Sequence, residues 1–214
     1  YLAWKEKVIE DFSDENINLL YNTGYVFTRV GRGMMNQTRS VRIDLSKFEL
    51  SSENRRILRK TENIDLKIVD LPYSAYDWTI GKLAKDFYTT KFGDGTFSAN
   101  KTKEILTDTE KSNYNKLFVY TLENKTIGYC VIKETNELIH YCYPFYDLDN
   151  SPKDTGLGMM TRAVLWAKEN NKKYVYLGSF QRPTDTYKLQ FAGIEWFDGE
   201  KWSGDLEGLK KEIK

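Results

Sequence analysis

Residues 138–180 read LIHYCYPFYDLDNSPKDTGLGMMTRAVLWAKENNKKYVYLGSF, and this stretch decides the fold. It begins with an apolar, aromatic strand at 138–146, passes through a loop with Gly156 and Gly158, and enters a helix from about Leu157. A second strand at 174–178 and a short helix around Tyr187 follow. Strand, glycine turn and helix N-terminus bring unpaired backbone N–H groups and the positive end of a helix dipole to one point. We expect phosphate or a developing oxyanion to bind there.

The pattern around this stretch has period two, which is typical of strands. Segments 117–122, 126–133 and 138–146 are separated by short turns and predict an antiparallel meander. The following strand–helix–strand unit predicts a right-handed crossover to a parallel neighbour. The sequence therefore predicts one α+β domain, a mixed sheet flanked by helices at 71–214, with a small N-terminal subdomain at 1–70.

Weaker patterns predict the remaining elements. We expect a helical opening that Gly24 closes, and a capping box of Ser74 and Asp77 before the most regular helix. The other predicted elements are short strands at 25–30, 40–43 and 64–69, a polar helix at 101–110 and a final hairpin at 195–202.

Composition excludes several classes of protein. The chain has 214 residues, 40% hydrophobic and 29% charged, with a net charge of +1, so the molecule as a whole has no strong field. Two cysteines and one histidine rule out a conventional zinc site built by this chain alone, and we expect no metal. No apolar run reaches membrane-spanning length and no signal peptide opens the chain, so we expect no membrane partner and a cytoplasmic location.

Positive charge is concentrated near the amino end. Between Arg29 and Lys60 there are nine Lys and Arg against three acids. Ser51 or Ser52 can cap a helix on which positions four apart share a face, so its charges form one surface. Two interpretations stay open, a solvated basic face or a surface that contacts nucleic-acid phosphates. The residues concerned are Arg32, Arg39, Arg55, Arg56, Arg59 and Lys60.

The loop Lys153-Asp154-Thr155-Gly156-Leu157-Gly158 resembles the pyrophosphate loop of the GNAT acyltransferase fold, with Lys153 in place of the usual Gln or Arg. Three other segments resemble a particular family with this fold. Residues 52–60 (SENRRILRK) and 41–48 (VRIDLSKF) are similar to consecutive segments of arginyl-tRNA–protein transferases and their bacterial leucyl-transferring relatives. Residues 174–178 (YVYLG), followed by Tyr187-Lys188 and Phe191, resemble that family's C-terminal signature.

This resemblance implies a GNAT-like enzyme that moves an amino acid from aminoacyl-tRNA to the N-terminal amine of a protein or peptide, usually one with an acidic first residue. It implies aminoacyl-tRNA as co-substrate and no other cofactor. The sequence departs from the family at 34–39, MMNQTR, where the family has a cysteine pair that belongs to a metal or cluster site. We therefore do not expect a metal-regulated version.

Candidate site residues follow from the fold and the chemistry. An amine attacking an activated ester needs positioning, a modest base and oxyanion stabilisation, and no Ser-His-Asp or Cys-His motif is present. We expect Tyr187 to handle a proton or orient substrate, and Gln181 to hydrogen-bond the donor. Gly156, Leu157 and Gly158 would hold the donor, while Arg182 or Lys188 would hold an acidic side chain or a phosphate.

The strand predicted at 138–146 and the residue after it add candidate site residues, each with two possible interpretations. Alternation places Tyr141, Tyr143 and Phe145 on one face, and His140 and Cys142 on the other, where we expect satisfied core residues. Tyr141 and Tyr143 would be either core aromatics or a platform for the terminal adenine of tRNA. Asp147 would be a substrate contact or a turn residue.

Two other functions compete with the transferase. The glycine loop also fits an acetyl-CoA-dependent N-acetyltransferase. The missing cysteines also fit a catalytically inactive module that binds tRNA or peptide.

Overall fold

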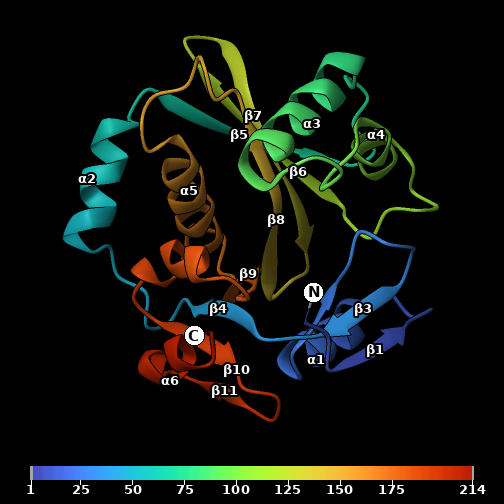
Figure 1. Ribbon diagram of the computed structural model, residues 1–214, viewed down its shortest axis with the longest axis vertical. Helices are drawn as coiled ribbons and strands as arrows, with labels where there is room; N and C mark the ends of the chain where they lie inside the picture. Colours follow the sequence, from blue (N-terminus) through green and yellow to red (C-terminus); the bar gives the residue numbers. More distant parts are fainter. Residues whose placement is uncertain (1, 214) are drawn as a thin grey trace. The chain divides into compact units, whose positions relative to one another are not determined.

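The computed structural model describes residues 2–213, and helices flank a large mixed β-sheet, as the α+β prediction requires (Figure 1). Contacts divide the chain into two compact units. The first unit comprises the chain up to Arg56, residues 134–140 and the chain from Val164 onward; the second comprises residues 57–133 and 141–163. The predicted division at residue 70 stays a prediction.

The sheet of the first unit joins segments that are far apart in the sequence. Its order is β11-β10-β4-β9, followed by the first residues of β8. β4 is antiparallel to both β9 and β10, and β8 is parallel to β9 with His140 opposite Tyr176. The parallel pair confirms the crossover predicted from the strand–helix–strand pattern. The strands are β4 (Ser40–Asp44), β8 (Leu138–Tyr146), β9 (Tyr174–Ser179), β10 (Ile194–Phe197) and β11 (Trp202–Ser203).

The amino end of the first unit corrects one prediction. The expected helical opening is wrong for residues 5–8, which form β1 (Lys5–Val8) and pair with β3 (Met34–Gln37), itself paired with β2 (Tyr25–Phe27). A helix begins only after Ser13, whose side chain caps it by accepting from the Asn16 N–H. This helix is α1 (Asp14–Asn22), and Gly24 with a φ of +82° closes it as predicted.

The second unit contains the predicted meander. The order is β8-β7-β6-β5, from β5 (Ile64–Asp70), β6 (Lys116–Leu122), β7 (Lys125–Glu134) and the later part of β8. Two helices, α3 (Trp78–Phe92) and α4 (Ala99–Thr107), pack against each other beside these strands (Figure 1). The predicted capping box is wrong. Asp77 is the N-cap and accepts from the Thr79 N–H at 2.6 Å, so Ser74 lies before the helix.

The remaining helices carry the candidate residues. They are α2 (Ser52–Lys60), α5 (Thr155–Glu169), the 3₁₀ helix η1 (Pro183–Gln190) and α6 (Leu206–Lys211). Ser51 caps α2, as predicted, by accepting from the Asn54 N–H at 3.0 Å. Within residues 2–213, no helix combines the length and the apolar character needed to cross a bilayer.

Candidate functional site

β9 ends in a turn that begins the predicted catalytic segment. Gly178 has a φ of +77°, a conformation that glycine adopts without strain. The turn is fixed to the first unit because the Phe180 N–H donates to the Arg39 carbonyl at 2.7 Å. η1 then folds back, and Lys188 Nζ donates to the Ser179 carbonyl at 2.6 Å. The segment from Gly178 to Lys188 is therefore a closed, internally bonded loop.

Lys188 is the most unusual residue of this loop. It is only 8% exposed, and lysine is rarely buried this far without a partner. Burial is the main cause that lowers the pKa of its ammonium group; the Asp185 carboxylate opposes this effect, and the Arg182 charge adds to it. Lys188 is one of the expected substrate-contacting residues, and that role stays a prediction.

His140 lies near Lys188 and is held by Tyr21. The Tyr21 hydroxyl accepts from the Phe27 N–H at 3.4 Å, and it lies 3.0 Å from His140 Nδ1. We assign the hydroxyl proton to the bond with Nδ1, which places the ring proton on Nε2. Burial, together with the Lys188 charge, lowers the pKa of His140 to about 3. The prediction of a neutral core histidine is confirmed.

Tyr21 is a partner that the sequence did not indicate. It is fully buried, and its ring contacts both His140 and Tyr176 edge to face. It lies 119 residues from His140 in the chain, on a helix whose pattern marks Tyr21 only as apolar. No local motif could have found this pair.

The other residues of the loop differ in exposure. Gln181 Nε2 is buried and has no hydrogen-bond partner among residues 2–213, whereas Arg182 and Tyr187 are exposed, Tyr187 by 43%. The backbone N–H groups of Gln181 and Arg182 both donate to Asp185 Oδ2, at 2.9 and 3.0 Å, and fix the start of η1. The structure thus brings Gln181, Arg182, Tyr187 and Lys188 onto one short loop.

In the second unit, the glycines of the 153–158 loop have a packing role. A Cβ on Gly158 would lie 2.5 Å from Thr61 Oγ1, and a Cβ on Gly156 would lie 3.2 Å from the Tyr146 hydroxyl. A backbone hydrogen bond from Gly156 also helps to hold that hydroxyl. The side chain of Thr61 therefore leaves no room for a Cβ at Gly158, whereas a Cβ at Gly156 would only be in tight contact with Tyr146. A role of Gly156, half-buried Leu157 and Gly158 in donor binding stays a prediction.

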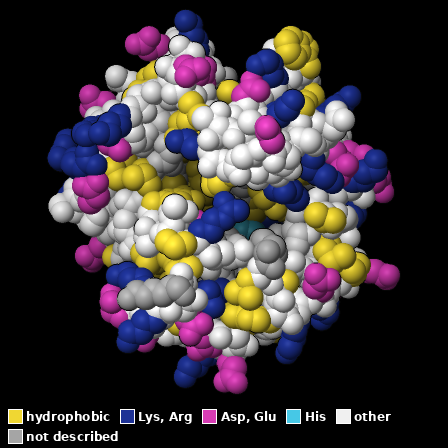
Figure 2. All heavy atoms as spheres, in the orientation of Figure 1, with side chains coloured by type: hydrophobic (Ala, Val, Ile, Leu, Met, Phe, Trp, Pro, Cys, Tyr) yellow, Lys and Arg dark blue, Asp and Glu magenta, His cyan; other side chains and the backbone are white. Residues whose placement is uncertain are grey.

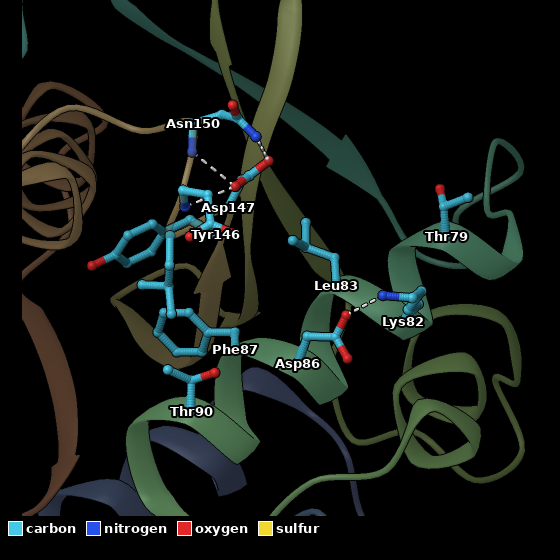
Figure 3. Close-up of a pocket in the computed structure, with 11 residues that line it drawn as sticks. Thr79, Lys82, Leu83, Asp86, Phe87, Thr90, Tyr146, Asp147 and Asn150 are labelled. Carbon is cyan, nitrogen blue, oxygen red and sulfur yellow. Dashed lines mark hydrogen bonds and ion pairs between the residues drawn. The ribbon is translucent and has the colours of Figure 1, made fainter.

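A cavity of about 460 Å³ lies between α3 and the segment after β8 in the same unit (Figure 3). Leu83 and Phe87 form its apolar wall, and the ion pair of Lys82 with Asp86 lies on its α3 side (Figure 3). Asp147 accepts from Asn150 Nδ2 at 2.9 Å and from the N–H groups of residues 149 and 150. The Asn150 side chain first, and then these N–H groups, hold the pKa of Asp147 below its usual value against the effect of desolvation. Asp147 therefore stabilises a turn, and this turn lies beside the cavity.

The two candidate tyrosines of β8 are in the second unit. Tyr141 is 4% exposed, and burial raises the pKa of its phenol well above the usual value. Tyr143 has a φ of +46°, so the simple alternation along the strand is broken there. Its ring stacks on Phe97 at 5.4 Å and its hydroxyl accepts from Tyr114 at 3.4 Å. Both side chains have core contacts, and a contact with tRNA stays a prediction.

The basic residues fall into two groups. Arg55, Arg59 and Lys60 are exposed, although Lys60 also pairs with Asp154 at 3.4 Å, and Lys and Arg side chains gather over α2 in the space-filling view (Figure 2). Arg56 pairs with Glu53 at 2.5 Å, and Arg39 pairs with Glu212 at 3.1 Å. Arg32 is exposed, with its guanidinium 4.3 Å from the Phe12 ring centre. α2 thus carries more accessible charge than the segment before it.

No group of three or more His, Cys, Asp or Glu that could hold a metal ion occurs among residues 2–213. Both cysteines are buried, and neither forms a disulfide within residues 2–213. Cys130 Sγ donates to the Cys142 carbonyl at 3.0 Å, and burial raises the pKa of both thiols. These thiols therefore have the properties of core residues.

Solved structures with a similar fold define the class of protein. L-PGS from Bacillus licheniformis superposes with a TM-score of 0.50 at 16% identity, over 77% of this chain and 51% of that one. A GCN5-related glucosamine N-acetyltransferase region of a fungal GH3 β-N-acetylglucosaminidase gives a TM-score of 0.51 at 10% identity, over 89% of this chain and 22% of that one. The fold is a GNAT-like acyltransferase fold.

The sequence comparisons assign the chain to a particular family within this fold class. The chain belongs to the family described as arginine-tRNA-protein transferase, C terminus, whose model matches residues 80–198, more than half of the chain. Two similar curated proteins are the aspartate/glutamate leucyltransferases of Saccharophagus degradans, 22% identical over 166 residues, and Ruegeria pomeroyi, 24% identical over 168 residues. Each alignment covers 76% of this chain, and 69% and 60% of those proteins. The family is one of aminoacyltransferases, and the matched region includes the loop from Gly178 to Lys188.

Proposed function

We propose that this protein transfers an amino acid from aminoacyl-tRNA to the N-terminal amine of a protein or peptide. The observation that carries the proposal is the family match over residues 80–198, on a GNAT-like fold. The names of the curated relatives make leucine the first donor to test, and acceptors beginning with Asp or Glu the first acceptors. The chain spans 60–69% of the length of these relatives.

The proposed reaction is an aminolysis. The acceptor nitrogen forms a bond to the carbonyl carbon of the aminoacyl ester, the ester C–O bond breaks, and the ribose oxygen leaves as a hydroxyl group. Since the ester is already activated, positioning and stabilisation of the oxyanion supply most of the acceleration. Gln181 supports this assignment because its buried amide N–H₂ has no protein partner and can donate to the donor carbonyl. Tyr187, exposed on the same loop, would orient the substrate.

We assign the tRNA contacts to the exposed basic residues. Arg55, Arg59 and Lys60 on α2 are accessible to phosphates, and Arg32 is exposed on the loop before β3. In this proposal aminoacyl-tRNA is the co-substrate, no further cofactor takes part, and the protein works in the cytoplasm, where aminoacyl-tRNA is available.

The test uses the whole chain with a mixture of charged tRNAs and a peptide library that varies the first residue. We expect a mass gain of one amino acid on the N-terminus of peptides beginning with Asp or Glu. Acetyl-CoA in place of charged tRNA is the control donor. A gain of an acetyl group in that arm alone would identify an N-acetyltransferase, and binding of tRNA with no product in either arm would identify an inactive module.

A further inference from the structure

Lys188 has no carboxylate partner. Among the described residues no carboxylate lies within ion-pair distance of it, and its hydrogen bond is to the Ser179 carbonyl at 2.6 Å. Lys172 in the same unit provides the contrast. Its side chain is also buried, at 9% exposed, and it also donates to a carbonyl at 2.6 Å, but it pairs with Glu134 at 2.8 Å. Of these two lysines, Lys172 has a carboxylate partner and Lys188 has none within residues 2–213.

An uncompensated ammonium ion in a buried position is costly, so burial shifts the equilibrium of Lys188 toward the neutral amine. The groups that face Lys188 do not reverse this preference. Asp185 and Arg182 on η1 have opposite charges and opposite effects, and His140 on β8 is neutral and has its Nδ1 engaged by Tyr21. Tyr187, next in the chain, presents its ring 5.9 Å from Nζ. A neutral amine has a lone pair, which an ammonium ion lacks.

We propose that Lys188 is a catalytic residue, the base that takes the proton which the acceptor nitrogen loses during transfer. This inference rests on the proposed function. Lys188 Nζ takes one proton from the acceptor ammonium, and the amine so formed attacks the carbonyl carbon. The N–C bond forms, the ester C–O bond breaks, and a second proton passes from the nitrogen to the ribose oxygen, which leaves as a hydroxyl. The Ser179 carbonyl, already 2.6 Å from Nζ, stabilises the ammonium so formed.

Other groups of this loop fit the role less well. His140, with a pKa of about 3, is too weak a base for an ammonium ion. The Tyr187 phenol, 43% exposed, is a proton donor in its neutral form. Lys188 is a stronger base than His140, and burial lowers its pKa relative to that of an exposed lysine.

The experiment compares two acceptors in single-turnover transfer at pH 7, with wild type, Lys188→Met and Lys188→Arg. One peptide ends in an ordinary α-amine; the other ends in an aminooxy group, which is unprotonated at this pH and needs no base. With the amine peptide we expect both variants to be about fivefold slower than wild type, because about one sixth of an α-amine with a pKa of about 7.7 is already neutral at pH 7. With the aminooxy peptide we expect no deficit.

Lys172→Met is the matched control, and we expect its deficit, if any, to be the same with both acceptors. Thermal melting and tRNA binding establish that each variant is folded, and Lys188→Gln replaces any variant that is not. Equal deficits with the two acceptors, or no deficit, would overturn the base role and leave the proposed function intact. If wild type itself transfers nothing to either peptide, the proposed function fails and this inference fails with it.

Discussion

At the scale of single residues, the buried pair of Tyr21 and His140 makes stability depend on pH. The pKa of His140 is about 3 in the folded chain and near 6.5 when unfolded, so the unfolded chain binds more protons between these values. The contribution of His140 to the free energy of unfolding therefore rises with pH across this window and is constant above pH 6.5. The shift corresponds to about 1.4 kcal/mol per pH unit.

The prediction is that acidification from pH 6.5 to 5 costs wild type about 2 kcal/mol more than it costs His140→Asn. Chemical denaturation of both proteins at the two pH values measures the difference. Since the Lys188 charge also lowers the pKa of His140, Lys188→Met should reduce the acid sensitivity of wild type. Identical losses in wild type and His140→Asn would contradict the assignment.

The sequence indicated some of these residues but not which of them contact one another. His140 was predicted as core because it alternates with Tyr141 on an apolar strand, and its burial is confirmed. The partner Tyr21 and the uncompensated state of Lys188 could not be predicted, because both depend on which distant segments approach. A motif such as Tyr187-Lys188 indicates a type of loop, whereas the protonation state of Lys188 depends on the side chains that surround it.

At the scale of elements, the start of α5 packs tightly on the end of α2. A Cβ at Gly158 would lie within 3 Å of three atoms of Thr61. Arg162 on α5 fixes Thr61 by donating to its hydroxyl at 2.8 Å and to its carbonyl, so Thr61 cannot move away easily. The glycine that resembled a phosphate-binding feature is thus first a helix-contact glycine.

We therefore predict that Gly158→Ala lowers the free energy of unfolding by about 1–3 kcal/mol, the usual cost of overpacking, despite the better helix propensity of alanine. Urea denaturation measures it. Gly204→Ala is the matched control, because a Cβ there would meet nothing within 4 Å. If Gly158→Ala is as stable as wild type and loses only transfer activity, the glycine acts through ligand approach.

Arg42 connects the strands of the first unit. Its guanidinium contacts Glu195 of β10 at 2.9 Å and lies between the rings of Tyr174 and Trp202, about 4 Å from each. We predict that Arg42→Ala destabilises the fold by about 3–5 kcal/mol, since it leaves the half-buried Glu195 without its main partner. Lys47→Ala removes the exposed partner of the same carboxylate and should cost less than about 1 kcal/mol. Comparable losses in denaturation experiments would contradict this ranking.

Element prediction succeeded where periodicity was strong and failed where pairing was non-local. The meander, α5 and β9 follow from alternating or helical patterns in one segment. β1 could not be predicted, because Lys5–Val8 is exposed along its length and is a strand only through its partner β3. Likewise, the sequence places Arg42 in a cluster of basic residues. In the fold, its guanidinium instead forms an ion pair and packs against aromatic rings.

At the scale of the whole molecule, the basic face of α2 predicts the salt dependence of tRNA binding. Arg59→Ala with Lys60→Ala removes two exposed charges and should weaken binding and flatten the dependence of affinity on salt by a slope of about 2. Lys5→Ala with Lys7→Ala on exposed β1 changes net charge equally and is the control. Fluorescence anisotropy over a salt series measures both. Equal effects of the two pairs would show that only net charge matters.

The position of β4 has a consequence for the order in which the chain can assemble. β4 comes from the first quarter of the sequence, yet it lies between β10 and β9, which are near the end. During synthesis β4 has no neighbour until β9 has emerged, and it lacks its second neighbour until β10 has emerged. A truncated product that stops before Ile194 would present an unprotected edge along β4, a template for pairing with other chains. Ribosome-stalled products of increasing length should become protease-resistant only when β10 is included.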